Sequence, residues 1–423
     1  DVDGDQDSPD ALSEVEVRDY SALQTLLPRY WLPTRIEGES VHGREILPVA
    51  WGARTSGSDL VGRHEYDVKI ARSFDGPRNR TEWGGHYVWA GFGNPTFMVE
   101  TGQEWASRAP LLVSTGDAGQ QDALPDTLLP ILSERWLGGA VELRLKRMRS
   151  TGVLSLGGRT ISQRQRILEV DGEDSERFES LRPLSSLAEV RLSMGLSTAR
   201  SYPFSVSREN GISVSVGLRE RWDRSVPDSL IGLSGSDGAF REAVASVRGY
   251  HGIPGPGYSN HVLAFRTSVG ITDGPGSGTE HFSVGGGGGD GRGVLGFTPG
   301  NAFHRFPVRG TSTRAVRGNT AWAMSGEWRF PLMMIHAGVG AWPLHLDRIA
   351  GSLFVDVAGA GSDVGRSETE WSTVSSLGAE VVVFGLLLFK EVSRVRLGVA
   401  MPLEVAAGSA RRASVYLQTG WSF

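Results

Sequence analysis

The chain of 423 residues contains no cysteine, and it has no long apolar run. A helix needs about 20 consecutive apolar residues to cross a bilayer. The longest apolar stretch, residues 381–389, is far shorter and includes Gly385. These absences exclude helical membrane spans, disulfides and cysteine-bound metals. The lack of thiols also fits an oxidising compartment such as the bacterial periplasm.

Sequence signatures of chemistry are missing as well. No Gly-x-Ser-x-Gly elbow and no His-Glu-x-x-His helix occurs, and no two of the 9 histidines lie at a ligand spacing. A Gly-x-Gly-x-x-Gly pattern at 286–291 lies in a glycine run with no helical sequence after it, so it does not predict a dinucleotide site. The net charge of −5 gives no reason to expect nucleic acid. We predict no enzyme, no catalytic residue, no metal and no cofactor.

The overall composition is polar, with 39% hydrophobic residues, 22% charged residues and a mean hydropathy of −0.19. Such values ordinarily indicate a soluble protein of roughly two or three domains. A transmembrane β-barrel is an exception, because only every second residue of each strand must be apolar. Composition alone therefore leaves both classes open.

Alternation of apolar and polar residues decides between them. In residues 140–146, Val141, Leu143 and Leu145 alternate with charged residues, as in a strand with one apolar and one polar face. The same alternation returns in residues 65–71, 188–196, 212–219, 263–271, 322–332, 353–357, 371–387 and 394–403. Segments of about nine to twelve residues suit a tilted strand that crosses a bilayer. They exceed the five or six typical of a soluble β-sandwich or propeller, which is the alternative.

The sequence predicts an all-β fold, a transmembrane antiparallel β-barrel of about 16 strands. Residues 44–423 are expected to form the barrel and residues 1–43 an acidic, partly disordered N-terminal segment on the periplasmic side. The expected strands begin near 44, 62, 83, 95, 133, 151, 186, 210, 239, 261, 279, 318, 349, 371, 392 and 413. Long polar loops at 107–128, 170–185, 221–238 and 285–317 should all face the cell exterior.

The carboxyl end has the form typical of an outer-membrane barrel. Trp421 and Phe423 continue the apolar phase of a final strand that contains Val415 and Leu417, and Tyr416 lies on the polar phase. This signal predicts an integral protein of the cell outer membrane. Its expected surroundings are outer-membrane lipid and lipopolysaccharide, with periplasmic or envelope proteins as further partners.

A second motif lies in residues 281–332, where a long loop carries Val308, Arg309 and Gly310. This stretch resembles the bacterial surface antigen family, the sixteen-stranded barrels of outer-membrane assembly factors and two-partner secretion transporters. The resemblance implies that the loop folds into the lumen and that acidic residues on neighbouring strands hold its arginine there. Phe354 to Gly359 is similar to a second motif of the family, with one extra residue before the glycine.

The polar phases of the strands support the same arrangement. Glu327 and Asp356 lie on polar phases and should point into the lumen, where a guanidinium between two carboxylates forms charge-assisted bonds. We therefore predict that Arg309 pairs with Glu327 and Asp356. In the alternative, these residues are ordinary lumen charges that pair with whatever lies opposite. Thr311 stands where the family has an aromatic residue, so the loop tip is expected to be anchored differently.

The family's insertases and transporters carry periplasmic polypeptide-transport modules before the barrel, and residues 1–43 do not have the length of such a module. Residues 20–33 instead resemble the junction between a periplasmic propeller and a surface-antigen barrel. Two functions follow from these resemblances. The first is protein insertion, translocation or assembly, in which a seam between residues 46–53 and 414–423 opens for client strands. The second is a structural anchor that holds a periplasmic domain or partner, and a passive pore ranks below both.

Overall fold

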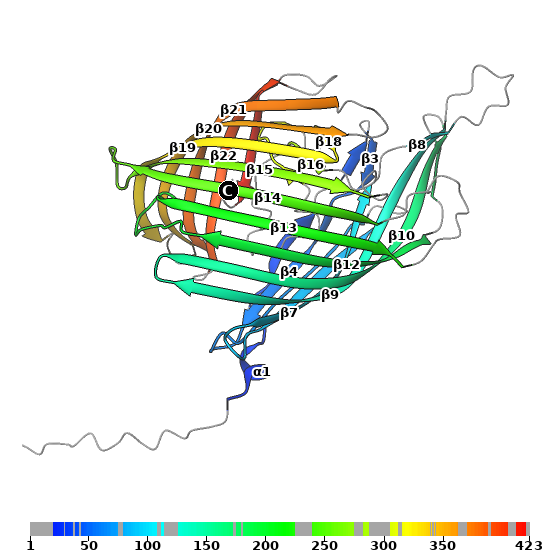
Figure 1. Ribbon diagram of the computed structural model, residues 1–423, viewed down its shortest axis with the longest axis horizontal. Coiled ribbons are helices and arrows are strands. Elements are labelled where there is room, and N and C mark those ends of the chain that lie inside the picture. The colour runs from blue at the N-terminus through cyan, green and yellow to red at the C-terminus, as the bar shows by residue number, and fades with distance from the viewer. Residues whose placement is uncertain are drawn as a thin grey trace, which may run out of the picture.

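The computed structural model shows a single barrel-like sheet that curves around a filled interior (Figure 1). The residues it describes are 20–28, 30–36, 39–41, 44–74, 79–107, 111–113, 126–171, 175–178, 181–224, 239–274, 282–286, 305–311, 315–338, 340, 342, 344–362, 370–387, 391–404 and 412–419.

One short helix, α1 (Ala22–Thr25), precedes the strands. The long strands are β4 (Ala50–Ser58), β5 (His64–Arg72), β6 (Thr81–Trp89), β7 (Thr96–Ser107), β9 (Asp126–Arg147), β10 (Ser150–Asp171), β12 (Arg182–Ser197), β13 (Gly211–Asp223), β14 (Phe240–Ile253), β15 (His261–Asp273), β19 (Thr320–Gly338), β20 (Leu344–Ser362), β21 (Glu370–Leu387) and β22 (Glu391–Glu404). The short strands are β1 (Leu32–Ile36), β2 (Glu39–Val41), β3 (Arg44–Leu47), β8 (Leu111–Val113), β11 (Ser175–Phe178), β16 (Phe282–Val284), β17 (Arg305–Phe306), β18 (Val316–Gly318) and β23 (Ser414–Thr419). No helix of the described part is long and apolar enough to cross a membrane.

The barrel strands pair in chain order, each antiparallel to the next, from β1 and β4 at one end of the run to β22 and β23 at the other. Of the 18 strands in this sheet, β8 and β11 are short additions to β9 and β10, so sixteen strands form the run. β15 pairs directly with β19, and the intervening residues therefore belong to one long loop. The predicted all-β antiparallel architecture and its strand number are confirmed.

One expected strand lies outside the run of sixteen, and one strand of the run was not expected. The strand expected near 279 is β16, and it pairs with β17 and β18 in a separate sheet rather than in the barrel. Conversely, β1 pairs with β4 although its residues fall in the segment expected to precede the barrel. The seam of the run therefore involves β1 rather than the residues 46–53 expected from the sequence.

Each long strand separates an apolar outer face from a mainly polar inner face. On β15, Leu263, Phe265 and Ile271 are about half exposed, whereas Arg266 and Thr272 on the opposite face are buried. An apolar exterior is the arrangement that contact with lipid requires. The four long connections expected to share one end do so, because they join β7 to β9, β10 to β12, β13 to β14 and β15 to β19 in an antiparallel order.

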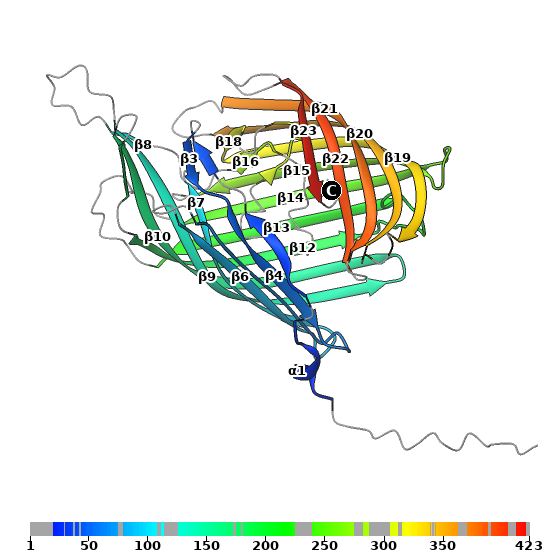
Figure 2. The same cartoon turned by 180° about the vertical axis from the view of Figure 1, so that it is seen from behind.

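Among the described residues, the largest apolar cluster lies inside the barrel rather than between layers. The small sheet of β16, β17 and β18 packs on the inner faces of β19, β20 and β21. Its fully buried members are Phe282, Val284, Phe306 and Val308, which meet small residues such as Ala358 on the wall. The long loop after β15 thus enters the lumen and presents its tip to the wall (Figures 1 and 2).

Candidate functional site

The small lumenal sheet fixes the position of the loop tip. The rings of Phe282 and Phe306 meet edge to face with centroids 5.2 Å apart. Val308 forms an isolated antiparallel bridge with Gly286 and is fully buried. Two strands and an aromatic pair therefore hold the chain immediately before residue 309.

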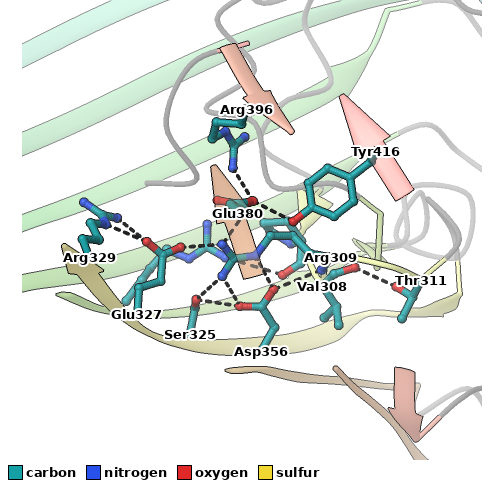
Figure 3. Close-up of polar contacts among 12 residues, drawn as sticks. Val308, Arg309, Thr311, Ser325, Glu327, Arg329, Asp356, Glu380, Arg396 and Tyr416 are labelled. Atoms are coloured by element: carbon teal, nitrogen blue, oxygen red, sulfur yellow. Dashed lines mark hydrogen bonds and ion pairs between the residues drawn. The ribbon is translucent and has the colours of Figure 1, made fainter. Parts of the chain in front are cut away.

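Arg309 is 1% exposed and makes its principal contact with Asp356 on β20 (Figure 3). Its Nε and Nη2 donate to the two carboxylate oxygens of Asp356, each at 2.7 Å, and its backbone amide donates to Oδ2 at 3.0 Å. Such a bidentate pair is stronger and more directional than a single ion pair. The backbone contact also fixes the main chain of the tip, not only its side chain.

Further groups complete the surroundings of the guanidinium. Nη1 donates to Oε1 of Glu327 at 2.6 Å, and Nη2 donates to Oγ of Ser325 at 3.1 Å. The ring of Phe354 lies beneath the guanidinium, with Cζ 3.5 Å from the ring centroid. A planar cation over an aromatic face gains a cation–π contribution in addition to its hydrogen bonds. We refer to Arg309, Ser325, Glu327, Phe354, Asp356 and Glu380 as the lumen clamp.

The clamp extends to the last two strands through Glu380 on β21. Glu380 lies 3.5 Å from Nη1 of Arg309 and accepts a bond of 3.1 Å from Arg396 on β22. Tyr416 on β23 donates to the same carboxylate at 2.7 Å. Arg329 adds an ion pair of 2.6 Å with Glu327. The arginines Arg309, Arg329 and Arg396 thus pair with three carboxylates in a buried layer. Their mutual attraction offsets the free-energy cost of removing each charge from water.

Gly310 and Thr311 shape the end of the tip. Gly310 has a φ of +83°, and a Cβ atom there would lie 2.4 Å from Cβ of Ala400 on β22. Thr311 donates to the carbonyl of Val308 at 2.9 Å and accepts from the amide of Gly286 at 3.2 Å. A threonine therefore closes the turn through hydrogen bonds, at the position where the family that this region resembles has an aromatic residue.

The structure brings together Arg309, Glu327 and Asp356, the three charged residues singled out in the sequence. It adds Ser325, Phe354, Glu380 and Tyr416, which sequence reasoning did not select. Tyr416 and Glu380 both lie on polar phases of their strands, but a phase does not reveal which loop a side chain will meet. Trp421 and Phe423 lie outside the described residues. Among the residues that are described, no group of three or more His, Asp and Glu side chains is arranged to hold a metal ion.

Comparisons with known proteins match the fold of the chain. No protein-family model and no curated protein matches the sequence. The solved structure of CdiB from Escherichia coli superposes with a TM-score of 0.58 at 13% identity, over 93% of this chain and 63% of CdiB. This chain shares that barrel fold. CdiB from Acinetobacter baumannii gives a TM-score of 0.51 at 8% identity, over 92% of this chain and 59% of that one.

BamA from Haemophilus ducreyi lacking POTRA domains 1–3 also matches, with a TM-score of 0.48 at 12% identity over 92% of this chain and 69% of that one. The chain spans about three fifths of the length of the two CdiB structures. The likeness to CdiB confirms the predicted transmembrane barrel fold.

Proposed function

We propose that this protein is an integral outer-membrane barrel of the surface-antigen type that acts in the insertion or assembly of other outer-membrane proteins. The apolar outer face and the barrel fold support the location. Outer-membrane lipid and lipopolysaccharide would then surround the sheet. Client barrels, and periplasmic or envelope proteins that deliver them, would be the partners.

The seam between the first and last strands carries this proposal. Within the described residues, β1 covers 5 positions and β23 covers 6, whereas β22 beside it covers 14. Within the described part of the chain, no pairing joins β23 to β1 or β4. In Figure 2, β4 and β23 both lie on the side of the barrel that is turned toward the viewer. Strand edges without a partner can pair with an incoming strand, which is how a client hairpin would be received.

The composition of β1 agrees with an edge role. Pro33 lies within this strand, opposite Ala53 of β4. Proline cannot donate a ladder hydrogen bond and is confined to edge strands, strand starts and bulges. Pro33 therefore agrees with an edge position for β1, and because it would limit hydrogen bonding there, the edge of β23 is the better site for a client strand.

The lumen clamp supports the same function by holding the other side of the seam. A Cβ at Gly310 would lie 3.2 Å from Oγ of Ser414, the first residue of β23, so the loop tip touches the last strand directly. Tyr416 of the same strand reaches the clamp through Glu380. A passive pore would need an open lumen, and the folded loop and its buried charge layer argue against one.

A reconstituted insertion assay tests the proposal. Liposomes that contain the purified barrel, or no protein, receive an unfolded small test barrel, and the folded fraction is scored by heat-modifiable migration on gels. Because the chain has no cysteine, cysteines introduced at Pro33 of β1 and at Val415 or Leu417 of β23, which lie on the outward phases of their strands, test whether the seam can be locked reversibly.

We expect faster test-barrel folding with the wild-type protein, its loss when a cysteine pair is oxidised, and its return on reduction. Single-cysteine variants serve as controls. Equal folding with and without the barrel would refute the proposal, and so would an oxidised seam that still accelerates folding.

A structural anchor is the second candidate, and one observation favours it. The entry segment is tied to the barrel: the hydroxyl of Tyr20 donates to Asp59, Tyr30 and Ser56 share a bond of 2.6 Å, and Thr55 donates to the carbonyl of Tyr30 at 2.7 Å. Such a fixed entry would hold a preceding periplasmic domain in a constant orientation. Purification from native membranes in mild detergent, followed by identification of tightly bound envelope proteins, would test it.

A further inference from the structure

The connection between β12 and β13, residues 198–210, is unusual for its end of the barrel. The turn between β9 and β10 at the same end has only the two residues between Arg147 and Ser150. Residues 198–210 form instead a compact lobe, closed at its base by a bridge between Arg200 and Asn210. Phe204 at its tip has a φ of +68°, which is rare for a side chain of this size.

The lobe packs inside the barrel. Val206 is 0% exposed and belongs to an apolar cluster with Tyr250, Val262, Ala264, Ala350, Val382 and Phe384. On their strands these wall residues share the inward phase with the buried charges, for example Val382 with Glu380 on β21. The cluster therefore joins the lobe to β14, β15, β20 and β21, well beyond the two strands that the lobe connects.

Hydrogen bonds hold the lobe in this position. Glu209 is 4% exposed and accepts bonds from Ser205 at 2.6 Å and from Asn260 at 3.1 Å. Asn260 belongs to the next connection at this end, residues 254–260, which joins β14 to β15. From that connection Tyr258 donates to the carbonyl of Ile349 on β20 at 3.0 Å. Two neighbouring connections are thus tied to each other and to β20, two strands beyond β15 in the sheet.

Along the β20–β21 side of the barrel, the lumen is filled in three successive layers. Along β20, Ala350 belongs to the cluster around Val206, Asp356 to the lumen clamp, and Ala358 to the cluster beneath the long loop. Along β21 the same three layers are met at Phe384, Glu380 and Val374 in turn. The buried charges thus lie between two apolar layers, one supplied from each end of the barrel.

We propose that residues 198–210, braced by residues 254–260, form an inner plug that seals the lumen at the end opposite the long loops. The seal acts in series with the long loop and its clamp. The lumen is then not the route of a polypeptide, and any client must be handled at the seam. This sealing property does not depend on insertase activity, although its consequence for clients builds on the proposed function.

Conductance in planar bilayers tests the series arrangement. The variants are Arg309→Ala, which releases the outer seal, Val206→Asp, which places a charge in the apolar cluster, and the two together. Tyr202→Ser, an exposed position on the same lobe, is the matched control. We expect wild type, the control and each single variant to give little conductance, and the double variant at least a tenfold increase. Conductance in Arg309→Ala that equals the double variant would overturn the proposal.

Thiol labelling gives a second readout if Val206→Asp fails to fold. Ser352 faces the lumen between the inner plug and the clamp and is 2% exposed. A cysteine there, or at Val206, should react with a soluble maleimide at least a hundredfold more slowly than a cysteine at Tyr202. Comparable rates at the three positions would show that the inner end is open and would refute the plug. Because this readout needs no client, its failure is distinct from failure of the insertion assay.

Discussion

Tyr416 of the last strand donates a hydrogen bond of 2.7 Å to Glu380, the carboxylate that also faces Arg309. Through Glu380, the arginine of the lumenal loop helps to hold β23 in place. Removal of the Tyr416 hydroxyl should therefore lower the protection of the β23 amides against hydrogen exchange.

Tyr416→Phe keeps the ring and deletes this bond. Because a hydrogen bond to a charged group contributes about 1.5–3 kcal/mol, amides of β23 should lose protection by roughly ten- to a hundredfold in hydrogen exchange. Tyr202→Phe, at an exposed tip, is the control and should change nothing. Unaltered protection of β23 in Tyr416→Phe would show that the strand is held by its pairing with β22 alone.

Arg309→Lys tests the geometry of the clamp rather than its charge. Lysine retains the positive charge but cannot make two parallel bonds to Asp356 or lie flat over Phe354. We expect Arg309→Lys to lower the temperature at which the compact form unfolds on gels. Arg309→Ala should lower this temperature further, because a broken buried ion pair costs about 3–5 kcal/mol. Equal stability of Arg309→Lys and wild type would mean that charge alone holds the tip. Arg144→Lys, on an exposed pair, is the control.

Gly310→Ala should release the tip for two separable reasons. The positive φ at this position is strained for alanine, and the new Cβ would lie 2.4 Å from Cβ of Ala400. The double variant Gly310→Ala with Ala400→Gly removes the contact and keeps the backbone strain. We predict a partial recovery of unfolding temperature in the double variant relative to Gly310→Ala. A double variant no more stable than Gly310→Ala would assign the whole effect to φ.

The entry segment should respond to acid. Burial alone would raise the pKa of Asp59, but hydrogen bonds from Tyr20 and from the amides of His64 and Arg63 outweigh it and hold the pKa below its ordinary value. A lowered pKa in the folded state means that the tether contributes fully above the unfolded pKa of about 3.9 and is lost as pH falls through the folded pKa. It should therefore persist from neutral pH down to about pH 4.

Hydrogen exchange of residues 20–31, expressed as protection factors at pH 3 and pH 7, checks this expectation. Asp59→Asn should lower protection at pH 7 and abolish most of the difference between the two pH values. Protection that does not change with pH in the wild-type protein would exclude Asp59 as the group that ties the segment.

Much of the barrel could be predicted from the sequence because its physical cause is local. Alternation records which side of a strand meets lipid, and fifteen of the expected strands appear in the sheet as β4 to β7, β9, β10, β12 to β15 and β19 to β23. The two differences have a common origin. Residues 282–284 form a strand, but periodicity cannot tell which partner a strand will take, and this one pairs within the loop.

The first strand was missed for a different reason. β1 has 5 residues, contains Pro33 and shows no alternation long enough to detect. Only its register with β4 reveals it as part of the sheet. In the clamp, Glu327 and Asp356 could be selected because a family motif accompanied them, whereas Glu380 lies next to an apolar run and meets Arg309 only through the curvature of the sheet.

The position of the clamp residues along the chain has a consequence for folding order. Every group that holds Arg309 comes later in the sequence than the arginine itself, on β19, β20 and β21, with β23 attached through Tyr416. The loop cannot be secured until the carboxyl-terminal hairpins have been laid down, so its capture is a late event that reports completion of the sheet. A chain truncated before β20 lacks both Asp356 and Glu380 and should then leave the loop unsecured, and the arginine would serve as an internal check that these strands have arrived.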